Sequence, residues 1–116
     1  MENMETNFSI EVEEKNETPI IRVQGEIDIY TCPKLSEQLN ILVEKGIKNL
    51  LLNLDKVHYI DSTGLGIIAH AARTIGDEGQ ITIISAKPQI KKIFEISGLQ
   101  NKNITLCEEE EMALGN

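Results

Sequence analysis

The sequence predicts an α/β domain built on a mixed, mainly parallel sheet of about five strands, with about four helices. Short apolar runs that suit buried strands alternate with segments of helical periodicity, the order that produces parallel strands joined by crossover helices. Two strand-like segments joined by a short turn open the chain, so an antiparallel hairpin should form one edge of the sheet. With 116 residues and no linker or internal repeat, the chain has the length of one domain. We expect residues 1–7 to be a flexible N-terminus and residues 8–116 to form the domain.

The expected hairpin joins the first two strands. Residues 8–12 alternate apolar and polar side chains, which is the pattern of a half-exposed strand. Residues 15–18 have the composition of a turn, and residues 19–24 form the partner strand, which residues 25–28 are expected to end.

A helix and a buried strand should follow the hairpin. Thr31 can cap this helix, Pro33 fits its first turn, and Gly46 ends it. Residues 49–54 form a near-continuous apolar run, which predicts a strand covered on both faces. The residues expected on the buried face of the helix are Leu35, Leu39, Leu42 and Val43.

A second helix should follow the turn at Asp61 and Ser62 and end near Gly76 and Gly79. Residues 81–84 then predict another buried strand. The residues expected on the buried face of this helix are Leu65, Ile68, Ala69, Ala72 and Ile75.

The last third of the chain continues the alternation. A helix should run from Pro88 to Gly98, residues 104–106 should form the last strand, and residues 108–114 a short last helix. Residues 108–111 are all glutamates, and we expect them to be solvated and to complement the dipole of that helix. The residues expected to be buried by the helix that starts at Pro88 are Ile90, Ile93, Phe94 and Ile96.

The segment over residues 57–66, VHYIDSTGLG, carries the most chemistry. An apolar run ends in an acid, two hydroxyls and two glycines just where a helix begins. Unpaired N–H groups and the helix dipole favour negative charge there, so a phosphate on Ser62 would cost the fold little and would strongly affect a docked partner. Ser62 could also be a helix N-cap, which is compatible with phosphorylation because capping geometry would point the hydroxyl at the surface, and Asp61 could be a turn aspartate that binds its own backbone. Thr63 is the poorer phosphate acceptor because it is β-branched and lies further into the turn.

Composition excludes several classes of function. A net charge of −8 disfavours nucleic acid as a partner, and no apolar run approaches the ~20 residues of a membrane span. The first residues lack a secretory signal pattern, so we expect a cytoplasmic protein in which Cys32 and Cys107 are reduced thiols. His58 and His70 have no third ligand at metal-like spacing, and we expect no metal or cofactor.

Three segments of the chain match a known pattern: VQGEID at residues 23–28, DSTGLG at residues 61–66, and GQITI at residues 79–83, followed by Pro88 and by SGL at residues 97–99. In these segments the chain resembles the STAS domain family, and specifically its bacterial anti-sigma factor antagonists. The resemblance implies that an anti-sigma factor serine kinase phosphorylates Ser62. The unphosphorylated protein would sequester that kinase and free a sigma factor, and a serine phosphatase would reset the cycle. The expected last helix is shorter than is usual in the family.

Further site residues follow from the resemblance together with the predicted topology. Asp61 and Asp28 are candidates for supporting phosphoryl transfer, and Asp28 should share a rim with Ser62 because loops at the carboxyl ends of parallel strands open on one edge. Glycines at positions 64 and 66 would leave the approach to Ser62 unobstructed. The residues expected to bind the partner are Tyr30, Thr63, Gly64, Gly66, His70 and Arg73.

Two other functions compete with a phosphorylation switch. The chain could be a STAS scaffold subunit, without such a switch, in a signalling or lipid-transport complex. A small hydrolase that uses Ser62 is the weaker alternative, because no nucleophile elbow, phosphate loop or paired-carboxylate cleft is present. The sequence therefore favours a regulatory binding protein over an enzyme.

Overall fold

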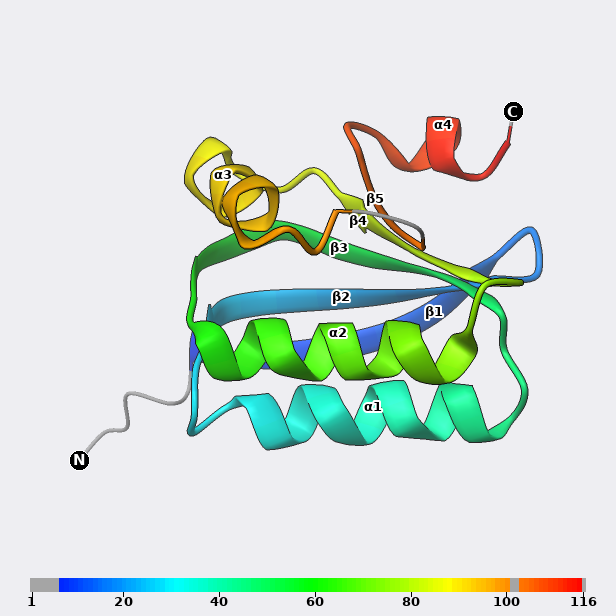
Figure 1. The fold of residues 1–116 in the computed structure, drawn as a ribbon, viewed down its shortest axis with the longest axis horizontal. Helices are drawn as coiled ribbons and strands as arrows, with labels where there is room; N and C mark the ends of the chain where they lie inside the picture. Colours follow the sequence, from blue (N-terminus) through cyan, green and yellow to red (C-terminus); the bar gives the residue numbers. More distant parts are fainter. Residues whose placement is uncertain (1–6, 101–102, 116) are drawn as a thin grey trace.

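A sheet with strand order β1-β2-β3-β4-β5 organises the computed structural model, which describes residues 7–100 and 103–115 (Figure 1). Only β1 and β2 are antiparallel; each later strand lies parallel to its predecessor, which confirms the predicted fold class. The strands are β1 (Ser9–Lys15), β2 (Thr18–Ile27), β3 (Asn49–Ile60), β4 (Gln80–Ile84) and β5 (Ile104–Cys107). The helices of the described residues are α1 (Cys32–Glu44), α2 (Ser62–Ile75), α3 (Pro88–Ser97) and α4 (Glu110–Ala113). Residues 1–6, part of the N-terminus expected to be flexible, lie outside the described residues.

The hairpin closes through a two-residue turn at Asn16 and Glu17, both with positive φ (51° and 67°). Positive φ at both central residues is the requirement of the tight turns whose twist matches that of the flanking strands. Beyond the turn, β2 ends within residues 25–28, as expected. It bends at register shifts near Gly25 and continues to Ile27, while β3 runs six residues past its apolar stretch to Ile60.

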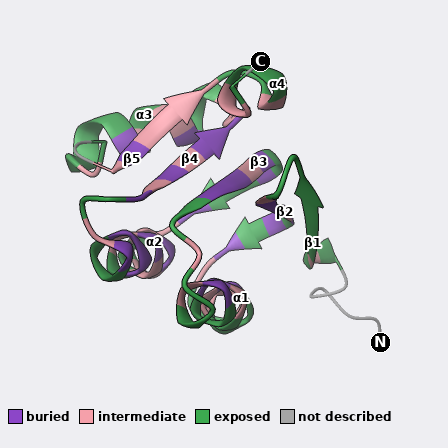
Figure 2. Cartoon of the chain, turned by 90° about the vertical axis from the view of Figure 1, so that its right-hand side faces the viewer, coloured by how far each residue is buried: buried purple, intermediate pink, exposed green. Residues whose placement is uncertain are grey.

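The two faces of the sheet differ in cover. In Figure 2, α1 and α2 lie together on one side of the sheet and α4 on the other. The large core that α1 and α2 form with the sheet also includes Ile90 and Phe94 of α3. On the opposite face, α4 and the residue that follows it place Ala113 and Leu114 against a small apolar cluster of strand residues. That cluster consists of Ile20, Leu51 and Ile84.

The buried faces of the helices agree in large part with the predicted ones. In α1, Leu35, Leu39 and Leu42 are buried, and Val43 is partly buried. In α2 the buried stripe starts at Gly64 and includes Ala71, whereas Leu65 and Ala69 are only partly covered. The buried residues of α2 are Gly64, Ile68, Ala71, Ala72 and Ile75.

In α3 the prediction for one residue is wrong. Ile90 and Phe94 are fully buried, but Ile96 is 77% exposed. At 100° per residue, position 96 points about 160° away from position 94, so the helix that buries Phe94 must expose Ile96.

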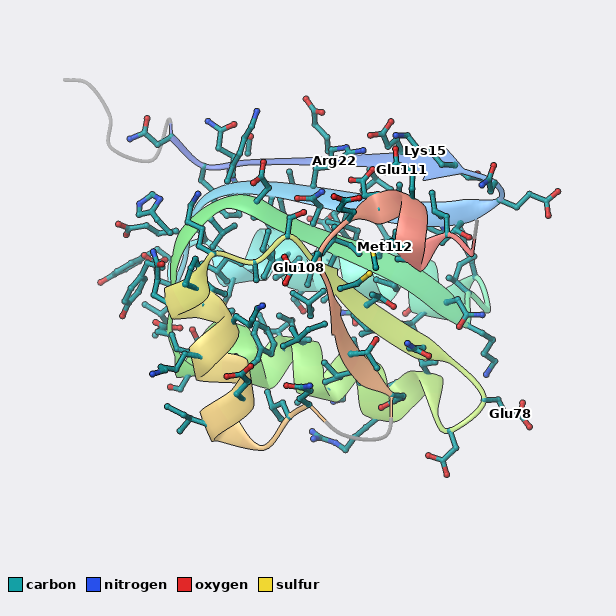
Figure 3. The ribbon with its side chains drawn as sticks, turned by 90° about the horizontal axis from the view of Figure 1, so that it is seen from above. Lys15, Arg22, Glu78, Glu108, Glu111 and Met112 are labelled. Carbon is teal, nitrogen blue, oxygen red and sulfur yellow. The ribbon has the colours of Figure 1, made fainter. Side chains whose placement is uncertain are left out.

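The last helix is also shorter than the expected 108–114, and its acidic start is not simply solvated. Glu110 is only 14% exposed because its carboxylate crosses to the face of the hairpin and β3. It accepts hydrogen bonds from Arg22 (2.5 and 3.0 Å), Asn53 (2.6 Å) and Lys15 (3.4 Å). Arg22 also pairs with Glu13. Figure 3, which looks down on this face, shows the side chains of Lys15 and Arg22 beside α4.

Candidate partner-binding site

Helix α2 begins one residue earlier than a Ser62 cap would require. Asp61 has extended backbone (φ −106°, ψ −174°) and is the N-cap, and Ser62 is the first helical residue. One oxygen of the Asp61 carboxylate accepts hydrogen bonds from the backbone N–H groups of Thr63 (3.0 Å) and Gly64 (3.2 Å). The interpretation of Ser62 as the cap is therefore wrong, and that of Asp61 as a turn aspartate bound to its own backbone is confirmed.

The hydroxyl of Thr63 also donates to the Asp61 carboxylate, at 2.5 Å. This hydrogen bond, followed by those from the backbone N–H groups of Gly64, Thr63 and Ile29, lowers the pKa of Asp61 below its usual value. The carboxylate is therefore charged at neutral pH and holds both the helix start and the neighbouring loop.

Ser62 differs from both of its neighbours. Its side chain is exposed, and within the part of the chain that the structure describes its hydroxyl has no hydrogen-bond partner. Of the three adjacent oxygen-bearing side chains at residues 61–63, only that of Ser62 is unengaged and accessible.

A second loop, after β2, lies on the same edge of the sheet. Asp61 N–H donates to the Ile27 carbonyl (3.1 Å), and the backbone N–H of Ile29 reaches the Asp61 carboxylate. The expectation that the Asp28 loop and Ser62 share a rim is thus confirmed. At the tip of this loop Ile29 is 60% and Tyr30 87% exposed.

Asp28 holds this loop as Asp61 holds the helix start. Its carboxylate accepts from the N–H groups of Tyr30 (2.9 Å) and Thr31 (3.0 Å). Thr31 is the N-cap residue of α1 by position, but its hydroxyl donates to the Glu26 carbonyl (2.7 Å) and makes no capping hydrogen bond to the helix. The prediction of a Thr31 side-chain cap is therefore wrong, because the hydroxyl is used within the loop.

The outer face of α2 carries the other expected contact residues. Gly66, His70 and Arg73 are exposed, and helical spacing places them on the same face as Ser62. Thr63 is half-buried. Gly64 is buried, and a Cβ there would lie 2.6 Å from Ile27 and 2.8 Å from Ile60, so Gly64 offers a partner no surface.

Sequence reasoning missed one aromatic residue at this edge. Tyr59 is 47% exposed beside Glu26, its neighbour in the register of β2 and β3. The sequence carried no signal for it, because strand alternation would place Tyr59 on the same face as the buried Val57. The register shift between Gly25 and Glu26, which pair with Val57 and Tyr59, interrupts that alternation. Tyr59 adds exposed aromatic surface at the end of β3, two residues before Asp61.

The histidines do not assemble a metal site. The Nε2 atom of His58 lies 3.4 Å from a carboxylate oxygen of Glu26, and His70 is the one histidine in α2. Among residues 7–100 and 103–115, no group of three or more potential ligands could hold a metal ion. In the same residues, no helix combines the length and apolar character needed to cross a membrane.

Comparisons with known proteins identify the family of this chain. The family model described as the STAS domain matches residues 9–113. An anti-sigma-B factor antagonist of Listeria monocytogenes is 38% identical over 98 residues, covering 82% of this chain and 85% of the relative. One of Staphylococcus aureus is 32% identical over 96 residues, covering 82% and 89%. The crystal structure of an anti-sigma factor antagonist from Mycobacterium paratuberculosis has a TM-score of 0.83 at 26% identity, covering 92% of this chain and 91% of that one.

Proposed function

The chain belongs to the STAS domain family, with anti-sigma factor antagonists as its relatives, and we propose that it acts by partner switching. In this proposal the unphosphorylated protein binds an anti-sigma factor serine kinase in the bacterial cytoplasm and so frees a sigma factor. Phosphorylation of Ser62 by the bound kinase ends the interaction. A serine phosphatase then restores the binding form.

The state of the Ser62 hydroxyl is the observation that carries this proposal. It is exposed and unengaged within the described residues, whereas Asp61 and Thr63 are bound to each other. An exposed hydroxyl that makes no hydrogen bond within the substrate can enter a kinase active site without first breaking one. Asp61 supports this role by fixing the backbone from which Ser62 projects.

The surroundings of Ser62 support a protein partner. Ile29, Tyr30 and Tyr59 supply exposed apolar and aromatic surface on one side, and the outer face of α2 supplies His70 and Arg73 on the other. Aromatic and arginine side chains are the residue types most often responsible for binding energy at interfaces. A phosphate between these two regions would add about −1.5 to −2 charges to a contact from which water is excluded, and binding would fail.

Phosphate transfer tests the proposal directly. Incubated with a purified anti-sigma factor kinase from the same organism, Mg²⁺ and ATP, the protein should gain one phosphate by mass spectrometry. Ser62→Ala should gain none, and Thr63→Ala should still gain one. A phosphate found mainly on Thr63, or on Ser62→Ala at another position, would refute the assignment of the acceptor.

The contact surface can be mapped with charge and truncation variants. Arg73→Glu and Tyr30→Ala should each weaken binding of the unphosphorylated protein by more than about 1 kcal/mol, measured by calorimetry. Lys92→Glu, at an exposed position on α3, is the control and should bind as the wild type does. Lys91 is the poorer control because it pairs with Glu108 at 2.8 Å. Sensitivity at Lys92 together with indifference at Arg73 and Tyr30 would place the partner on another face.

A further inference from the structure

Gly66 is the one glycine of this chain whose presence its own fold does not explain. All eight glycines lie within the described residues. Five have positive φ, between 78° and 108°, which other residues rarely adopt: Gly25, Gly46, Gly76, Gly98 and Gly115. Two more have no room for a side chain, because a Cβ would lie 2.6 Å from Ile27 at Gly64 and 2.1 Å from the Lys48 carbonyl oxygen at Gly79.

Neither reason applies to Gly66. It lies in the second turn of α2, outside the positive-φ region, and its position is exposed. Apart from its two chain neighbours and the nearby backbone of α2 itself, no heavy atom of the described residues lies within 4 Å of the place where its Cβ would be. Glycine in a helix interior is less favourable than alanine because more backbone freedom is lost on folding. The fold would therefore be more stable with a side chain at position 66.

The location of Gly66 indicates what the missing side chain leaves free. Gly66 follows Ser62 by four residues, so the two positions are neighbours on one face of α2. Side chains on a helix lean towards its N-terminus, so a side chain at position 66 would cover the turn that carries Ser62. Its absence leaves bare helix backbone between the acceptor hydroxyl and His70.

We infer that Gly66 is a contact position, at which the kinase packs directly on the backbone of α2 to reach the Ser62 hydroxyl. This inference rests on the proposed function and adds to it the shape of the partner. The kinase surface beside its active site should project into the space at position 66 and contact the backbone of α2 there, so that this space is filled in the complex. The loss of binding should therefore grow with the size of any side chain placed there.

Stability and binding should change in opposite directions in the Gly66 variants. Gly66→Ala should raise the melting temperature and increase the ratio of folded to unfolded protein about fourfold. Its affinity for the purified kinase should fall about fivefold or more, the range of contacts that matter at interfaces. Gly66→Gln should fall further in affinity and in phosphorylation rate. Asn40→Ala, at an exposed position in α1, is the matched control that improves helix propensity in another helix and should leave binding unchanged.

The possible results separate this inference from the proposed function. If the wild type is bound and phosphorylated on Ser62, and both Gly66 variants behave like it, the inference is overturned and the proposed function stands. If Gly66→Ala lowers the melting temperature, the glycine has a structural reason and the inference is again overturned. If the wild type is neither bound nor phosphorylated, the proposed function fails and this inference fails with it.

Discussion

Ser62→Asp is expected to fold as the wild type does and to lose at least about 30-fold in affinity for the kinase. Ser62 is the first residue of α2, and the Asp61 cap does not use its hydroxyl, so the substitution breaks no hydrogen bond of the described residues. A carboxylate in the first turn is favoured by the helix dipole, which offsets repulsion from Asp61. In the complex, the same charge would be buried without a partner, and burying an unpaired charge weakens binding strongly.

Circular dichroism and calorimetry check the two halves of this prediction separately. Ser62→Asn is the control, because it has nearly the size of aspartate without the charge and should keep more of the affinity. If Ser62→Asp melts far below the wild type, the switch acts through unfolding of the domain. In that case the account of a folded protein that changes partners by charge is wrong.

Glu110→Gln should destabilise the fold by about 2 kcal/mol at neutral pH, the range of hydrogen bonds that involve charged groups. The Glu110 carboxylate is largely buried against Arg22 and Asn53, and Lys15 completes its contacts. These contacts, that with Arg22 first, lower its pKa from 4.5 to about 2 and raise the pKa of Arg22. A pKa shift of this size corresponds to a contribution of about 3 kcal/mol to the free energy of unfolding. The Arg22 side chain is 32% exposed, so screening by solvent makes the actual contribution smaller.

The pH dependence of this effect has a definite sign. A carboxylate whose pKa is lower in the folded than in the unfolded state contributes its full stability above the unfolded pKa, near 4.5. The contribution disappears as the pH falls towards 2. Denaturation curves of the wild type and Glu110→Gln should therefore differ at pH 7 and converge in acid. Glu111→Gln, at the exposed neighbouring position, should match the wild type at every pH, and equal losses in both variants would contradict the prediction.

The contacts of Glu110 also show which parts of the fold could be predicted from the sequence and which could not. The order of strands and helices follows from local periodicity, and every element was predicted, although β3 continues six residues past its apolar stretch and α4 is shorter than expected. The partners of Glu110 could not be predicted in this way. Arg22 lies 88 residues away, and only the assembled sheet brings the two together. The run of four glutamates at residues 108–111 predicts a solvated helix start, and nothing in the sequence distinguishes Glu110, the one that is largely buried, from the other three.

The candidate site, too, could be predicted only in part from the sequence. The segment at residues 61–66 predicts a polar helix start with an accessible hydroxyl, and the structure has one. Composition cannot assign the cap, because three adjacent residues carry suitable oxygens and the backbone angles of Asp61 decide between them. Composition also cannot separate Gly64 from Gly66. The two differ only in their tertiary neighbours, since Ile27 and Ile60 occupy the space at the first and nothing occupies it at the second.

The ion pair between Arg22 and Glu110 affects how the chain folds during translation. The hairpin that holds Arg22 leaves the ribosome before α4 does, because it precedes α4 in the chain. Until α4 emerges, Ile20 and Leu51 lack their cover and Arg22 lacks its principal carboxylate partner. The nascent chain can complete the face that holds α1 and α2 beforehand, but not the opposite one. The domain therefore gains its full resistance to unfolding only at the step in which α4 docks.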